Sequence, residues 1–142
     1  SRIVTEADGN VHLALDLIST EVEDHAQRLA DWMRSCYAQD AARMHALAEE
    51  FHELDKLEQH ALLNYALTMM RETMLMIAGA DSLLRSRDHE KKFVQDFSKV
   101  MRLPGVERAY HLLTDAGYQL ERNGSAKMIF LDTSLQLARV MN

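Results

Sequence analysis

The sequence predicts an all-α fold, a helical bundle of about six or seven helices, and three observations support it. Hydrophobic residues make up 47% of the chain and are mostly Leu, Ala and Met, with one Pro and five Gly. These are good helix formers with few helix breakers. Apolar residues also recur three and four positions apart in successive segments, as on buried helix faces. Finally, 142 residues suit one domain, and a domain of this size buries about 70% of its unfolded surface.

The first apolar helical segment covers residues 5–18, almost at the start of the chain. Val11, Ala14, Leu15 and Ile18 have the spacing of one buried helix face. Chain ends are usually polar and poorly ordered. We therefore expect the sequence to be a piece of a longer protein, with residues 1–19 the remnant of a preceding domain.

Two amphipathic helices are predicted next. Thr20 and Glu23 have the spacing of a capping box, which predicts a helix start at Thr20. The apolar side of this helix contains Val22, Ala26, Leu29, Trp32, Met33, Cys36 and Tyr37. Asp40 can cap the following helix, whose apolar residues are Met44, Leu47, Ala48, Phe51 and Leu54.

The segment 61–80 is apolar on most of its circumference and predicts the central helix of the bundle, or a helix completed by a partner. Its polar residues form one narrow stripe, which consists of Asn64, Thr68, Arg71 and Glu72. Such a helix needs neighbours on three sides, because burial of each Leu or Met contributes about 1.5 to 3 kcal/mol. Arg71 and Glu72 belong either to an exposed strip or to a polar contact across an interface.

Three further helices follow a turn and connection at 79–88. A short helix is marked by Phe93, Val94, Phe97 and Met101. Pro104 suits the first turn of the next helix, and Asn123-Gly124 predicts its left-handed end. Ser125 can cap the last helix, whose apolar residues are Met128, Phe130, Leu131, Leu135, Leu137, Ala138 and Met141.

The net charge and the lack of a recognisable targeting pattern restrict the partners that we expect for this chain. With a net charge of −6, we expect no strong direct binding to nucleic acid, which depends on Lys and Arg neutralising phosphates. The basic run at 85–92 is interrupted by Asp88 and Glu90 and indicates a solvated loop and helix start. No segment has the pattern of a secretory signal or of a long uncharged apolar span. We expect a cytoplasmic location and no membrane partner.

Catalytic and metal-binding patterns are weak. His45, Glu49 and His52 share a helix face, and Glu49-x-x-His52 has the spacing of di-iron helix bundles. Those bundles need two such motifs, so we predict a solvated face and no metal. Cys36 has no motif of an activated thiol and is expected to pack in the core. There is no phosphate-binding Gly-rich loop. We therefore expect no catalytic residue, no cofactor and no enzymatic activity in this chain.

Short motifs along the chain resemble clamp-loader subunits. Residues 7–15, with a Gly-Asn turn before an Ala-Leu pair, resemble the helix that closes the lid domain of clamp-loader ATPases. Residues 123–137, Asn-Gly-Ser-Ala-Lys followed by a Leu-rich helix, resemble the final collar helix of the delta-prime and gamma subunits of bacterial DNA polymerase III. The motifs at 32–37 and 64–67, the latter leading to Met-Arg-Glu at 70–72, are similar to delta-prime-like proteins in particular.

The resemblance implies a role in DNA replication. Clamp-loader subunits assemble as a pentamer through a ring of carboxy-terminal helical collar domains, and they open the sliding clamp on primed DNA. Residues 1–19 would be the remnant of an AAA+ lid domain and 20–142 the collar, whose partners would be the gamma/tau and delta subunits. His12 stands where ATP-using subunits carry a nucleotide-sensing Arg. An imidazole cannot replace a guanidinium at a phosphate, which favours the non-ATPase delta-prime branch.

Subunit contacts are expected on the central and last helices. The candidate interface residues are Met69, Arg71, Glu72, Met74, Leu135 and Met141. A second class of function is a free-standing helical adaptor or regulator that binds a protein partner through a Met-rich groove, because the chain contains nine Met.

Overall fold

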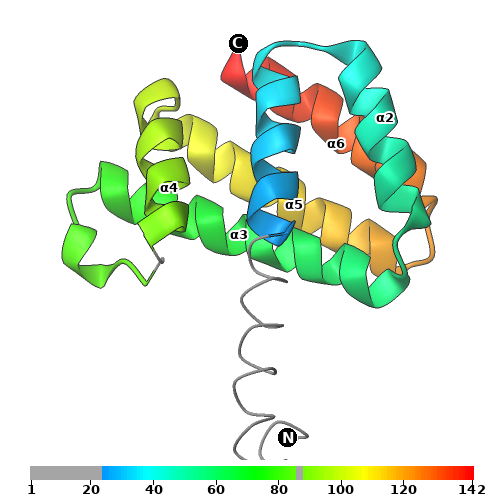
Figure 1. Cartoon of the computed structure of the whole chain (residues 1–142), viewed down its shortest axis with the longest axis horizontal. Helices are drawn as coiled ribbons and strands as arrows, with labels where there is room; N and C mark the ends of the chain where they lie inside the picture. The colour runs from blue at the N-terminus through cyan, green and yellow to red at the C-terminus, as the bar shows by residue number, and fades with distance from the viewer. Residues whose placement is uncertain (1–23, 86–87) are drawn as a thin grey trace, which may run out of the picture.

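The computed structural model describes residues 24–85 and 88–142, and in these ranges it consists of six α-helices and one 3-10 turn, without strands (Figure 1). The first helix occupies residues 24–37 of the described part. It is followed by α2 (Ala41–Glu53), α3 (Lys56–Ile77), the turn η1 (Asp81–Leu83), α4 (Asp88–Val100), α5 (Leu103–Glu121) and α6 (Ala126–Met141). The predicted all-α bundle is confirmed. The predicted start at Thr20, the segment 1–19 and His12 lie outside the described residues.

The helix α3 is the centre of the bundle. It packs against α5 and α4 and contacts η1, while α6 packs against α5 and α2. The prediction that this apolar helix needs several neighbours is therefore confirmed. Its start differs from the predicted position 61, because the Asp55 carboxylate accepts a hydrogen bond from the Glu58 N–H at 2.8 Å and caps the helix at Lys56.

Local capping sets the other helix ends. Asp40 and Ser125 accept hydrogen bonds from Arg43 N–H at 3.0 Å and Met128 N–H at 3.3 Å, so both predicted caps are confirmed. Three helices end in a residue with positive φ, namely Gln39 (55°), Gly79 (77°) and Asn123 (62°). At each of these ends, the N–H of the following residue donates to the carbonyl oxygen five positions earlier, as in the Schellman motif. The donor and acceptor pairs are Asp40–Ser35, Ala80–Leu75 and Gly124–Gln119.

An aromatic cluster joins the 24–37 helix to α2 and α6. The Trp32 ring stacks on Phe130 with the ring centroids 4.3 Å apart, and Phe51 lies 4.9 Å from Phe130. The Trp32 indole N–H donates to the Ser134 hydroxyl at 2.8 Å, and that hydroxyl donates to the Phe130 carbonyl at 2.7 Å. The first helix is thereby attached to the helix that ends the chain.

Glu72 departs from the sequence prediction. The apolar pattern placed it with Arg71 on one polar stripe, but Arg71 is exposed whereas Glu72 is 1% exposed. Consecutive residues on a helix point about 100° apart, so the two side chains face different surroundings. The Glu72 carboxylate accepts a hydrogen bond from the Arg85 N–H at 2.7 Å. It holds the segment after η1 against α3.

Replacement of Ser134 by Ala should destabilise the fold by about 1 to 3 kcal/mol, because the buried Trp32 N–H loses its acceptor. Urea denaturation followed by circular dichroism measures the free energy of unfolding. Ser98→Ala is the matched control, since the Ser98 hydroxyl donates only to the Gln95 carbonyl one turn earlier, in an exposed hydrogen bond, and it should shift stability by about 0.5 kcal/mol or less. Equal effects of the two substitutions would contradict this role of Ser134.

Replacement of Gln39 by Gly should stabilise the chain by about 0.5 to 1 kcal/mol, because a side chain is unfavourable in the left-handed conformation. The same urea titration measures this gain. Gly79→Ala, at the equivalent position after α3, should destabilise the chain. The alanine would have to adopt the unfavourable positive φ, and no neighbouring atom lies close enough to its Cβ to add a compensating contact. Destabilisation by Gln39→Gly would show that this helix end is not under strain.

Candidate functional site

An apolar groove with a volume of about 860 Å³ lies between the 24–37 helix and α4. Figure 1 shows these two helices standing side by side. We call it the α4 groove. Its lining residues are Ala26, Gln27, Ala30, Met33, Arg34, Tyr37, Ala38, Lys92, Phe93, Asp96, Phe97, Val100 and Met141.

Both walls of the α4 groove present apolar side chains at helical spacing. On the first wall Ala26, Ala30, Met33 and Tyr37 follow one another at intervals of three and four residues, and on α4 so do Phe93, Phe97 and Val100. Met33, Phe97 and Met141 are buried, whereas Tyr37 and Val100 are 51% and 49% exposed. The alanine side chains end at Cβ and leave the space that makes the groove hollow. The surface therefore has the pattern of two helix faces without a third helix between them.

Tyr65 of α3 contacts both groove walls near one end. Its hydroxyl donates to the Glu90 carboxylate of α4 at 2.6 Å, and its ring stacks on His25 with the centroids 5.8 Å apart. Burial and the adjacent Glu90 carboxylate raise the pKa of Tyr65, so its hydroxyl stays a proton donor. Tyr65 thus helps to set the separation of the two walls.

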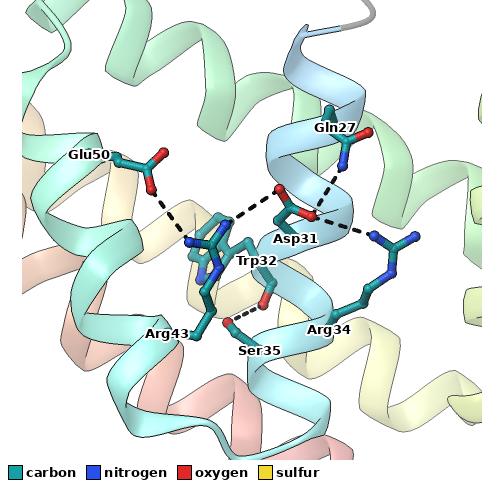
Figure 2. A network of polar contacts seen from close by, with 7 residues as sticks. All are labelled: Gln27, Asp31, Trp32, Arg34, Ser35, Arg43 and Glu50. Atoms are coloured by element: carbon teal, nitrogen blue, oxygen red, sulfur yellow. Dashed lines mark hydrogen bonds and ion pairs between the residues drawn. The ribbon is translucent and has the colours of Figure 1, made fainter.

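Charged side chains lie at the rim of the α4 groove, Arg34 on the first wall and Lys92 and Asp96 on the second. Figure 2 shows the network around Asp31, which accepts from Gln27 at 3.1 Å and from Arg34 at 3.5 Å and pairs with Arg43 of α2 at 3.7 Å. The Arg34 side chain is 74% exposed, and exposed pairs of this kind contribute about 1 kcal/mol or less. Arg34 can therefore change partners readily.

A second apolar surface lies on α6, and we call it the α6 stripe. Met128 and Leu135 are 59% and 46% exposed, with half-buried Leu131 between them at helical spacing. Met141 follows Leu135 by six residues and faces a different side of the helix, where it lines the α4 groove. The described structure thus has an apolar groove and an exposed apolar stripe, made of different residues.

The predicted interface residues fall into different environments. Arg71 and Leu135 are exposed, and Met74 is half-buried. Met69 and Glu72 are covered by this chain, and Met141 lies in the α4 groove. Their role in subunit contacts stays a prediction. The groove itself was not predicted, although the four-residue spacing of Ala26 and Ala30 was a signal for a close-packing face.

The predicted solvated face on α2 is confirmed, since His45, Glu49 and His52 are all exposed. Glu49 pairs with Lys127 of α6, and this hydrogen bond lowers the pKa of the Glu49 carboxyl. Within residues 24–85 and 88–142, no three His, Cys, Asp or Glu side chains are grouped so that they could hold a metal ion.

Cys36 is fully buried, as predicted for a core thiol. Burial raises the pKa of its thiol from 9.0 to about 12, so the nucleophilic thiolate is suppressed in the folded chain.

Comparison of the chain with family models, curated proteins and solved structures found no match. In the part of the chain that the structure describes, no helix has the length and apolarity needed to cross a membrane.

Cys36 should resist alkylation in the folded state. At pH 8, iodoacetamide is expected to label the native chain negligibly and the urea-unfolded chain completely, as measured by intact mass. Because the folded pKa lies above the unfolded value, the stability contributed by the buried thiol is present below pH 9 and is lost as the pH rises toward 12. The chain has one Cys, so rapid native labelling would directly contradict this assignment.

Proposed function

We propose that this chain is the collar domain of a bacterial clamp-loader subunit of the delta-prime type. In this role it has no catalytic activity of its own and supports sliding-clamp loading through contacts with the gamma/tau and delta subunits. The resemblance of residues 32–37, 64–67 and 123–137 to these subunits is the sequence support. The helical bundle is the architecture that the resemblance implies.

The observation that carries the proposal is the presence of two dissimilar apolar surfaces, the α4 groove and the α6 stripe. A subunit in a ring contacts one neighbour on each side, so it needs two different interfaces rather than one self-complementary patch. Exposed Met128 and Leu135 on the α6 stripe gain about 25 cal/mol for each Å² of apolar area that a neighbour covers. The net charge of −6 also favours protein neighbours over phosphate.

The free-standing adaptor is the second candidate function, and the α4 groove favours it because Met33 and Met141 contribute to its lining. Flexible Met side chains adapt to different apolar ligands. An adaptor of this kind would bind a partner segment without assembling with clamp-loader subunits.

The chain should form a stable complex with the gamma and delta subunits of its own organism, and light scattering of the mixture measures the mass. Leu135→Glu is expected to weaken this association at least tenfold, because it places a charge in the α6 stripe. Leu57→Glu is the matched control, since Leu57 is 81% exposed and belongs to neither surface. Absence of a complex with the unmodified chain at micromolar concentration would reject the collar function in favour of the adaptor.

A further inference from the structure

A small hollow with a partly polar lining lies between α3 and α5, and we call it the Gly117 hollow. Its volume is about 180 Å³, against about 860 Å³ for the α4 groove, so it has the size for one side chain rather than for a helix. Its lining residues are His60, Leu63, Asn64 and Leu67 of α3, and Leu113, Thr114, Gly117, Tyr118 and Glu121 of α5.

Gly117 lies inside α5, where the packing of the bundle does not require a glycine. A glycine within a helix is destabilising relative to alanine, because it loses more conformational freedom on folding. At Gly105, an added Cβ would lie 3.1 Å from the Met101 side chain, whereas at Gly117 it would meet no neighbouring atom within 4 Å. The missing side chain of Gly117 therefore leaves a space that the contact between α3 and α5 does not use.

Four polar side chains around this space are not engaged by the described part of the chain. On α3, His60 and Asn64 lie about one turn apart, and on α5 so do Tyr118 and Glu121. No hydrogen bond or ion pair joins these four side chains to another residue within 24–85 and 88–142. Their polar atoms can therefore bind a ligand without breaking a contact of the bundle.

The charge and the acceptor atoms of the lining favour a cation. Glu121 is its acidic residue, and a carboxylate accepts hydrogen bonds without donating any. The Thr114 hydroxyl donates to the Tyr110 carbonyl at 2.9 Å, which leaves the hydroxyl oxygen as an acceptor. Lys56, at the start of α3, does not line the hollow, and its ammonium group donates to Asn123 at 2.5 Å.

A guanidinium group fits this lining better than an ammonium group does. It is planar and carries five N–H donors in fixed directions, so it can form two parallel hydrogen bonds with the Glu121 carboxylate. Its flat face also stacks on aromatic rings, and the Tyr118 side chain is available because Tyr118 is 59% exposed. The carbon atoms of an arginine stem would contact Leu63 and Leu113, the buried apolar residues of the lining.

We propose that the Gly117 hollow binds the guanidinium group of an arginine side chain from a partner protein. The guanidinium pairs with Glu121 and stacks on Tyr118, and its other N–H groups donate to the Asn64 and Thr114 side chains. No Lys or Arg lines the hollow to bind the α-carboxylate of a free amino acid, which favours an arginine within a protein. The site shares no residue with the α4 groove or the α6 stripe, so it does not rest on the collar function.

Titration of the chain with ethylguanidinium chloride, followed through the backbone amide NMR signals, tests the site. The Gly117 and Asn64 amide signals should shift to saturation, and ethylammonium chloride at equal ionic strength should bind at least fivefold more weakly. Glu121→Gln should weaken ethylguanidinium binding at least fivefold. Glu107→Gln is the matched control, because Glu107 is exposed on the same helix and does not line the hollow. Absence of binding, equal binding of the two cations, or an unchanged affinity of Glu121→Gln would overturn the proposal.

Substitutions of Gly117 separate stability from binding. Gly117→Ala should raise the urea midpoint, because alanine is the better helix former and its Cβ would meet open space. Gly117→Leu should fill the hollow and abolish ethylguanidinium binding, while circular dichroism verifies that the variant is folded. A lower urea midpoint of Gly117→Ala would show that the glycine serves packing, and undiminished binding by Gly117→Leu would rule out this hollow as the site.

Two further probes distinguish an arginine within a protein from the free amino acid. N-acetylarginine methylamide has no charged α groups, like an arginine inside a chain, and should bind at least as tightly as ethylguanidinium. Free L-arginine should bind no more tightly than the blocked compound. Tighter binding of free L-arginine by a factor of ten or more would overturn the assignment to a partner protein.

Discussion

The anchoring of Trp32 is the interaction on which the arrangement of the surfaces depends. Its ring is 1% exposed, stacks on Phe130 and donates to Ser134 of α6. This contact fixes the rotation of the 24–37 helix about its own axis. Because Trp32 occupies the inner side of the helix, Ala26 and Ala30 are turned toward α4. The first wall of the α4 groove is thus a consequence of core packing.

The second wall is anchored through α3 rather than through the first helix. Glu72 of α3 holds the backbone at Arg85, just before α4, and Tyr65 of α3 bonds Glu90 within α4. Each wall therefore has an attachment of its own to the bundle, and both also contact Tyr65.

Periodicity and capping chemistry predicted the helices because both are local. Asp40, Ser125 and Asn123 act within one turn of their helix ends, where a sequence contains all the partners. The burial of Glu72 depends on Arg85 in a connecting segment, so it could not be predicted from the helix pattern alone. The groove was not predicted for a related reason. Its lining residues Ala26 and Tyr37 belong to the same apolar pattern of the helix as the core residues Leu29 and Trp32. Periodicity identifies the apolar side of a helix, but it does not indicate which neighbour covers it.

The difference between the two surfaces bears on the kind of contact that the chain can make. Self-complementary patches lead to dimers, whereas dissimilar ones lead to closed rings or open filaments. Arg34, Lys92 and Asp96 line the α4 groove besides its apolar residues, and Lys127, Asp132 and Arg139 lie beside the α6 stripe in the sequence. Arg34 is paired with Asp31 and Lys127 with Glu49, so these charges are partly neutralised within the chain. Apolar side chains of different kinds, rather than charge, therefore distinguish the two surfaces and disfavour a self-complementary contact.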